Sequence, residues 1–437
     1  MIGIEFLIVL AAIFIGARIG GVGLGVMGGV GLAILVFGFG LQPTSPPINV
    51  MLMIVAVITA ASSMQAAGGL TYLVNLAEKL LRKHPQRITF LGPLVTYLFT
   101  FVAGTGHVSY SILPVISEVA RETGVRPERP MSISVIASQQ AITASPISAA
   151  TVALLGLLAP QGVELIDILM VSVPATLIGV FIASLFANKM GVKLSEDPEY
   201  QRRLKNGEIE PVGNKKATTS SFGSKLSVYL FIGGTLAIVL FGSFAQLRPS
   251  WMVDGELVQM GMPQIIEIIM MSVAALILLS VKVKASDVGK SSVFSAGMQA
   301  VIAIFGIAWM GDTFIQGHMD VFSGGIKDLV TSYPWLFAAA LFILSILLYS
   351  QAATVRALMP LGIALGIPAP FLIAMFPAVN GYFFIPNYPT VVAAIQFDQT
   401  GTTKIGKYIL NHSFMLPGLI STITGIAMGF VFIQLLF

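Results

Sequence analysis

The chain alternates between long apolar runs and short polar stretches, and the apolar runs recur from Ile4 to Phe437. Most runs are close to twenty residues long, the length that an α-helix needs to cross the hydrocarbon core of a membrane. No basic residue precedes the first run and Arg18 follows it, so we expect a retained span and not a cleaved signal peptide. The pattern therefore predicts an all-α polytopic membrane protein.

Four polar, helix-breaking stretches interrupt these runs and form two matched pairs. The first pair is GTGHVSYSILP (104–114) with SQAATVRALMP (350–360), and the second is SQQAITASPIS (138–148) with NGYFFIPNYPT (380–390). Broken backbone is tolerated inside a membrane only where it lines a cavity or is buried in protein. We expect each member of the first pair to form the tip of a re-entrant hairpin, with helical arms at 88–103, 109–123, 335–349 and 355–366. Each member of the second pair should split a crossing helix into two half-helices.

The landmarks of the two halves recur in the same order. Pro146 and Pro174 are separated by the same 28 residues as Pro389 and Pro417. Two further matches are Gly68-Gly69 with Gly324-Gly325 and Pro114 with Pro360. The polar segment 191–224 lies between the halves and has no apolar run. We therefore predict an N-terminal transmembrane repeat at 1–190, a cytoplasmic linker at 191–224 and a C-terminal transmembrane repeat at 225–437.

Composition and charge refine this prediction. The 437 residues are 56% hydrophobic and 10% charged, and the absence of cysteine excludes disulfides, thiolate metal sites and thiol catalysis. The net charge of +4 does not indicate a nucleic-acid partner, because the basic residues belong to loops. In the predicted topology 21 basic residues lie inside and two outside, with Arg356 alone within the membrane. The positive-inside rule then places both termini outside and gives the halves opposite orientations, as inverted repeats.

Helices that end in mid-membrane leave N–H groups unpaired at their N-termini, and converging N-termini favour an anion. Because two-fold-related tips present similar donors from opposite sides, the natural ligand has a negative charge at each end, as a small dicarboxylate does. The candidate binding residues are Thr105, Gly106, His107 and Ser109 in the first tip, Ser350, Gln351, Thr354 and Arg356 in the second, Gln139, Ser145, Pro146 and Ser148 at the first helix break, and Asn380, Asn387, Pro389 and Thr390 at the second.

Arg356 is expected to face protein or a wet cavity, since an arginine at the bilayer centre costs roughly 2.5–3.5 kcal/mol on insertion scales. One interpretation is a bidentate clamp on a substrate carboxylate. The alternative is a structural ion pair with Asp312 or Asp398, the nearest acidic residues in the predicted topology. His107 either donates to a carboxylate or carries a proton, or else is a neutral histidine bonded to the broken backbone.

Two apparent nucleotide motifs are not supported by their context. Gly23, Gly25 and Gly28 form GxGxxG inside an apolar span, where small residues let helices pack closely. GTTKIGK (401–407) lacks the Ser or Thr that a phosphate loop requires, because Tyr408 follows it. HExxH and GxSxG are also absent, which argues against a membrane protease or lipase. We expect no cofactor, no metal site and no enzymatic activity.

One known family shares many of these stretches. The shared stretches are QAAGGL, EKLLRK, AGTGH, ILPVI, ITASPISAA, YSQAAT, ALMP, PTVVAAIQFD and TGTTKIGK, followed by Asn411, His412, Phe414, Pro417 and Gly418. At these residues, and across almost its full length, the chain resembles the Dcu family of anaerobic C4-dicarboxylate transporters. The forms SQAATVRALMP and DPEYQRRL are similar to the DcuA branch.

The resemblance implies exchange of fumarate, malate or aspartate for succinate across a bacterial inner membrane. With the orientation given by the charge bias, both termini are then periplasmic. On architecture alone, the chain also resembles the elevator-like carriers of the ion-transporter superfamily, which are usually dimers, so a homodimer is expected. No sodium site is carried over, because the hairpin signatures of the sodium-coupled relatives do not occur here.

Three readings of function compete. The leading one is a secondary antiporter of C4-dicarboxylates. The second is a proton-coupled uptake carrier for an acidic amino acid such as aspartate, with His107 or Asp312 carrying the proton. The third is a dicarboxylate-binding membrane sensor or scaffold, which does not explain why a binding site would need inverted repeats.

Overall fold

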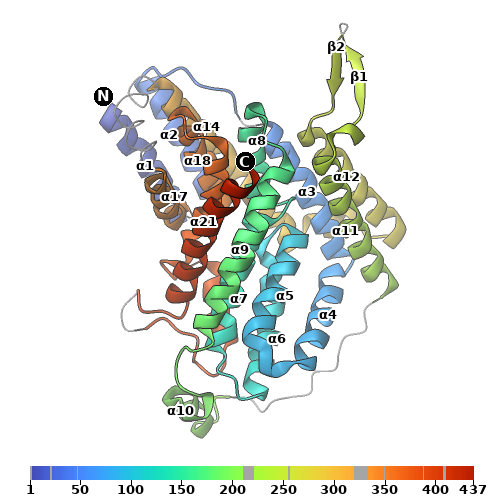
Figure 1. Ribbon diagram of the computed structural model, residues 1–437, viewed down its shortest axis with the longest axis vertical. Coiled ribbons are helices and arrows are strands. Elements are labelled where there is room, and N and C mark those ends of the chain that lie inside the picture. Colours follow the sequence, from blue (N-terminus) through green and yellow to red (C-terminus); the bar gives the residue numbers. More distant parts are fainter. Residues whose placement is uncertain are drawn as a thin grey trace.

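The computed structural model is a bundle of helices in which segments from both halves of the chain pack together (Figure 1). It describes residues 2–19, 22–46, 48–209, 221–253, 256–318, 333–348, 350–386, 388–406 and 410–437. Among these residues, five helical stretches are long and apolar enough to cross a membrane, or six when one bent pair is counted as a span. The prediction of a polytopic helical membrane protein is confirmed.

The elements follow the predicted order in each half. The N-terminal half contains α1 (Ile2–Ile19), α2 (Gly23–Ala33), the π-helical turn η1 (Ile34–Gly38), α3 (Ile48–Ala66), α4 (Gly69–Lys83), η2 (Pro85–Arg87), α5 (Ile88–Ala103), η3 (Gly106–Val108), α6 (Ser109–Glu122), α7 (Glu128–Ala144), α8 (Ala149–Leu158), η4 (Ala159–Gln161) and α9 (Leu165–Ala187). The C-terminal half contains α11 (Phe222–Ser243), η6 (Ala245–Leu247), β1 (Ser250–Val253), β2 (Glu256–Gln259), α12 (Met262–Val281), α13 (Ala285–Gly289), α14 (Ser292–Gly317), α17 (Pro334–Leu348), α18 (Gln351–Ala364), α19 (Ala369–Ala374), η7 (Phe376–Phe383), α20 (Pro389–Phe397) and α21 (Met415–Leu436).

The arms of the two hairpins lie where the apolar pattern predicts them. The arms expected at 88–103 and 109–123 are α5 and α6, and the arm expected at 335–349 is α17. The fourth arm, α18, begins at Gln351, four residues before the expected start at 355. The reason is local, because Ser350 caps this helix by accepting the backbone N–H of Ala353 at 3.2 Å.

Both crossing helices are broken, but in different ways. The first consists of α7 and α8 with Ser145–Ser148 between them. The second begins with the short α19, continues as the 3-10 helix η7 and resumes as α20 after the break. Its first half is therefore irregular, where a single half-helix was expected.

The packing follows the pseudo-two-fold relation that inverted repeats require. α2 packs on α14 as α12 packs on α3, and α6 packs on α20 as α18 packs on α8. In these contacts α2 corresponds to α12, α3 to α14, α6 to α18 and α8 to α20. Each contact therefore occurs twice, once from each half. The pairs α9 with α21 and α3 with α14 contact each other directly. The Gly324-Gly325 landmark lies outside the described residues.

Glycines allow α2 and α14 to cross at very short range. A Cβ atom added to Gly306 would overlap the carbonyl oxygen of Gly25, and one added to Gly28 would overlap the backbone of Gly306. Small residues permit this approach between membrane helices. The GxGxxG pattern is therefore a packing motif, as its apolar context predicts.

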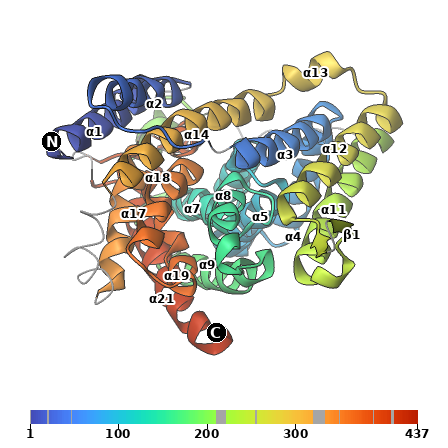
Figure 2. The same ribbon diagram turned by 90° about the horizontal axis from the view of Figure 1, so that it is seen from above.

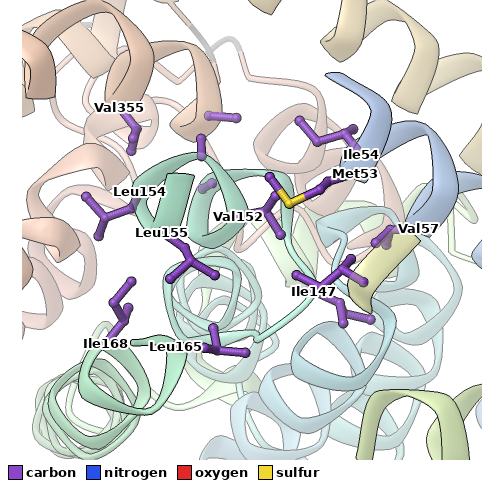
Figure 3. Close-up of a cluster of buried hydrophobic side chains, with 14 of the residues drawn as sticks. Met53, Ile54, Val57, Ile147, Val152, Leu154, Leu155, Leu165, Ile168 and Val355 are labelled. Atoms are coloured by element: carbon purple, nitrogen blue, oxygen red, sulfur yellow. The ribbon is translucent and has the colours of Figure 1, made fainter. Parts of the chain in front are cut away.

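The largest apolar core surrounds α8, the second half of the first broken helix. Val152, Leu154 and Leu155 of α8 are buried and point toward α3, α9 and α18 (Figure 3). A helix that is apolar on all sides is stable only when it is enclosed by protein or lipid. Figure 2 shows α18, α8 and α7 near the middle of the bundle when it is viewed from above. The first break is therefore held at the centre of the molecule.

One element departs from the all-α prediction. β1 and β2 form a two-stranded antiparallel sheet in which Trp251 pairs with Val258 and Met252 with Leu257. The hairpin projects from one end of the bundle, next to α11 and α12 (Figure 1). Its β-branched and aromatic residues favour a strand, and the apolar run that precedes it ends at Ser243.

The segment between the halves is partly helical and is held by buried charges. It contains η5 (Leu194–Glu196) and α10 (Pro198–Lys205), and residues 210–220 lie outside the described part. Arg126 lies between α6 and α7, and its guanidinium is 2.6 Å from the carboxylate of Glu128 and 2.5 Å from that of Asp197. All three side chains are buried. We call Arg126, Glu128 and Asp197 the linker ion network.

This network also contacts the C-terminal half. The Glu128 carboxylate accepts a hydrogen bond from Ser413 Oγ at 2.7 Å, and its backbone N–H donates to Thr402 Oγ1 at 3.1 Å. Arg203 of α10 donates to the carbonyl oxygen of Gln399 at 3.1 Å. The linker is thus bonded to both halves, at the end of the bundle opposite the β-hairpin (Figure 1).

Candidate functional site

The tip of the first hairpin lies against the first helix break. α5 ends at Ala103 and is capped by Gly104, whose φ of +68° is a left-handed conformation that favours glycine. Ser109, the first residue of α6, donates its hydroxyl to the carbonyl oxygen of Gly106 at 2.7 Å. A Cβ atom on Gly106 would lie 2.7 Å from Nε2 of Gln139, so the tip touches the end of α7. Thr105 is half-buried, and the side chain of His107 lies outside the described part.

The serines of the first break bond to backbone. Ser145 Oγ donates to the carbonyl oxygen of Phe101 at 2.6 Å, and Ser148 Oγ donates to that of Ile142 at 2.5 Å. Ser148 also caps α8 by accepting the N–H of Thr151 at 3.1 Å. Pro146 is buried between them. In this arrangement the two hydroxyls bond to carbonyl groups in the last turns of α5 and α7, which lack partners within their own helices.

The second tip brings an amide into the same region. Thr354 Oγ1 donates to the carbonyl oxygen of Ser350 at 2.9 Å, which closes the first turn of α18. Gln351 Nε2 donates to Gln139 Oε1 at 2.6 Å and to Asn380 Oδ1 at 3.2 Å. The second hairpin is therefore bonded directly to both helix breaks.

The second break completes the cluster. Asn380 Nδ2 lies within hydrogen-bonding distance of Gln140 Oε1 at 3.1 Å and of Thr143 Oγ1 at 3.4 Å. Gln139 Nε2 donates to Thr390 Oγ1, next to Pro389 at the start of α20, at 3.5 Å. Asn387 lies outside the described residues.

These contacts define a central amide network, made of Gln139, Gln140, Gln351 and Asn380. All four side chains are buried, and they come from α7, α18 and η7. Outside the predicted set, Gln140, Thr143 and Thr422 also belong here, since Gln140 Nε2 donates to Thr422 Oγ1 of α21 at 3.1 Å. Gln140 lies in the predicted stretch SQQAITASPIS and could have been found there. Thr422 stands in an unbroken apolar helix and carries no such signal.

Arg356 is buried on α18, one residue beyond Val355. Val355 faces α8, and successive helical residues point about 100° apart. Asp312 of α14 is the acidic residue whose charge acts on Arg356. Among the described residues no carboxylate lies within 4.0 Å of the guanidinium, and Nε has no hydrogen-bond partner. With 9% of its surface exposed, Arg356 therefore has unused hydrogen-bonding capacity.

Asp398 does not pair with Arg356, so this part of the prediction is wrong. Its carboxylate accepts the N–H of Thr400 at 2.9 Å, the hydroxyl of Thr402 at 2.8 Å and the N–H of Thr403 at 2.6 Å. The residue lies just beyond the end of α20 and organises the loop that follows it.

The arrangement suits an anion. α6 and α20 pack against each other and begin without a side-chain cap, so they have N–H groups available in their first turns. Carboxylates are favoured by the positive ends of helix dipoles and by the amide groups nearby. They are also favoured by Arg356, whose Nε has no hydrogen-bond partner among the described residues. Within the described residues, no group of three or more acidic or histidine side chains is placed to hold a metal ion.

Comparisons with known proteins agree with this chemistry. A family model described as "anaerobic C4-dicarboxylate membrane transporter" matches residues 1–437. C4-dicarboxylate transporter DcuA of Wolinella succinogenes is 45% identical over 431 residues, which cover 99% of each chain. DcuA of Escherichia coli K12 is 45% identical over 432 residues, again with 99% coverage of both.

A solved structure shares the fold. The crystal structure of the YdaH transporter of Alcanivorax borkumensis superposes with a TM-score of 0.55 at 13% identity, and the match covers 92% of this chain and 86% of that one. At this identity the likeness concerns architecture alone.

Proposed function

The chain belongs to the DcuA/DcuB family of anaerobic C4-dicarboxylate membrane transporters, and we propose from this premise that it is a secondary antiporter. It is a transporter and not an enzyme. In the proposed cycle, fumarate, malate or aspartate crosses the membrane in one direction and succinate in the other. The same binding site serves all of them, because each carries two carboxylates on a four-carbon chain.

The observation that carries the proposal is the central amide network, which joins both helix breaks to the second hairpin. In a carrier built from two repeats, substrate binds where the repeats meet and where helices are interrupted. The predicted residues of both tips and both breaks stay in the proposed site. Gln140, Thr143 and Thr422 are added to them.

Arg356 supports exchange over one-way uptake. With no carboxylate within 4.0 Å among the described residues, its charge is only partly balanced by Asp312. Moving an incompletely compensated charge through a low-dielectric region is unfavourable, whereas a bound dianion offsets it. The loaded carrier should therefore reorient faster than the unloaded one.

We further propose that the protein works as a homodimer in a bacterial inner membrane with both termini periplasmic. The bias of basic residues toward one side supports this orientation. Figure 1 agrees with it, since both termini lie away from the end that carries α10. Ser45 is exposed, so Ser45→Cys should react with an impermeant maleimide in intact cells. Labelling only after the membrane is opened would contradict the orientation.

The test of exchange is counterflow in proteoliposomes. Vesicles loaded with succinate should take up labelled fumarate, malate or aspartate quickly, and vesicles without internal substrate should take up little. Equal rates in both, rising with an inward proton gradient, would instead support a proton-coupled carrier for aspartate. Binding without any uptake would indicate a sensor or scaffold.

A further inference from the structure

Gln351 uses both hydrogens of its amide nitrogen within the central amide network. Nε2 donates to Gln139 Oε1 at 2.6 Å and to Asn380 Oδ1 at 3.2 Å. An amide NH₂ group has two hydrogens, so this donor is saturated. The acceptors are two carbonyl oxygens on different segments, α7 and η7, and both side chains are 1% exposed.

Gln139 Oε1 and Asn380 Oδ1 present two oxygen atoms to this NH₂ group, as the two oxygens of a carboxylate would. A carboxylate is a stronger acceptor than an amide carbonyl, because hydrogen bonds to an ionised group are roughly twice as strong as neutral ones. We propose that Gln351 receives one carboxylate of the substrate, and that Gln139 Oε1 holds this carboxylate's place whenever no substrate is bound. This inference rests on the proposed transport of dicarboxylates.

Gln140, the next residue along α7, has a different part in the same network. Its Oε1 accepts from Asn380 Nδ2 at 3.1 Å, and its Nε2 donates to Thr422 Oγ1 at 3.1 Å. These two bonds fix the amide of Asn380 so that its Oδ1 faces Gln351. Among the described residues no hydrogen bond joins Gln140 to Gln351, so Gln140 is a positioning residue.

The two neighbours should respond oppositely to one substitution. Substrate must displace Gln139 from Gln351 in order to bind, which leaves the Gln139 carbonyl without its donor. Gln139→Met removes the competing oxygen at similar volume, so the half-saturation concentration for fumarate should fall by about 2- to 10-fold. Gln140→Met frees Asn380 from its fixed orientation, so the same constant should rise by about 2- to 10-fold.

Both variants are measured in the full-length protein in succinate-loaded proteoliposomes, with equilibrium binding of labelled fumarate as the second readout. If Gln139→Met raises the half-saturation concentration, Gln139 is an ordinary ligand and the place-holder role is overturned, while the transport function stands. If Gln139→Met does not fold, Gln139→Asn withdraws the carbonyl by one methylene and should also lower the constant. Failure of the wild type itself to exchange any C4 acid would overturn the proposed function instead.

Discussion

Two buried arginines in this chain differ in what surrounds them. Arg126, 5% exposed, lies 2.6 Å from one carboxylate and 2.5 Å from another. Arg356, 9% exposed, has no carboxylate within 4.0 Å among the described residues, and its Nε has no hydrogen-bond partner there. The first charge is fully paired by the protein, and the second is left with capacity for another partner.

We propose that this difference separates a structural charge, Arg126, from a substrate-binding charge, Arg356. Burying an ion costs several kcal/mol, and paired neighbours offset that cost in the folded protein. Arg126 meets this condition, because Glu128 and Asp197 hold it where the linker meets both halves. The charge of Arg356 is compensated only weakly, by Asp312. This arginine should therefore stabilise a bound anion more than it stabilises the fold.

The largest expected effect is on stability, at Arg126. Arg126→Met leaves the carboxylates of Glu128 and Asp197 buried without their partner, which should cost about 3–5 kcal/mol of unfolding free energy. Thermal unfolding of the purified protein measures this loss. The control is Arg202→Met, since Arg202 makes its ion pairs on the surface with its side chain 51% exposed. The control should keep the wild-type melting temperature. A stable Arg126→Met variant would end the distinction between the two arginines.

The next effect is on binding, at Arg356. Arg356→Gln should keep the wild-type melting temperature, because no close ion pair is broken among the described residues. It should weaken fumarate binding by about 2–4 kcal/mol, roughly 30- to 1,000-fold, through loss of a charge-assisted contact. Arg356→Lys should retain a fraction of the affinity, since it keeps the charge but not the fork of donors. Wild-type affinity in Arg356→Gln combined with a lowered melting temperature would assign the arginine to the fold.

Local signals explain why so much of the fold was predictable. Proline, glycine and serine mark the ends of α5, α7 and α8, because these residues act on the backbone of their own segment. The apolar pattern predicts the start of α18 four residues too late, because it does not reflect the cap that Ser350 supplies. The strands β1 and β2 are too short to stand out in a chain dominated by twenty-residue apolar runs.

The site was only partly predictable for a different reason. Broken helices point to Gln139, Gln351 and Asn380 as a group, but the bonds among them depend on which helix faces pack together. Thr422 joins the network from a position 282 residues away from Gln140. Similarly, the contact between Arg126 and Asp197 links positions 71 residues apart. Sequence position and residue type alone do not encode such long-range contacts.

A smaller effect concerns the pH dependence of the linker ion network. Burial raises the pKa of the Asp197 carboxyl, but the backbone N–H of Tyr200 and the Arg126 guanidinium lower it more, so it lies below its ordinary value of 3.8. A carboxyl with a depressed pKa stabilises the fold above that ordinary value, and the stabilisation is lost as the pH falls through the folded-state pKa.

The melting temperature of the wild type should therefore fall as the pH drops below the ordinary value of 3.8. Asp197→Asn should lower it already at pH 7, by the equivalent of about 1–3 kcal/mol, and should flatten the decline in acid. Parallel pH profiles of the two proteins would show that another carboxyl group is responsible for the acid sensitivity.

The smallest effect compares a bonded and an unbonded uncharged side chain on α21, next to the central amide network. Thr422 Oγ1 accepts the amide of Gln140 at 3.1 Å, whereas the neighbouring Ser421 Oγ is buried without a hydrogen-bond partner among the described residues. Thr422→Val removes one neutral hydrogen bond at nearly constant volume, worth about 0.5–1.5 kcal/mol, so the half-saturation concentration for fumarate should rise by about 2- to 10-fold. Ser421→Ala, one residue away on the same helix, should leave it unchanged. If Ser421→Ala had the larger effect, the path from α21 through Gln140 to Asn380 would not contribute to binding, and the orientation of Asn380 would have to come from Thr143 and the backbone of η7 instead.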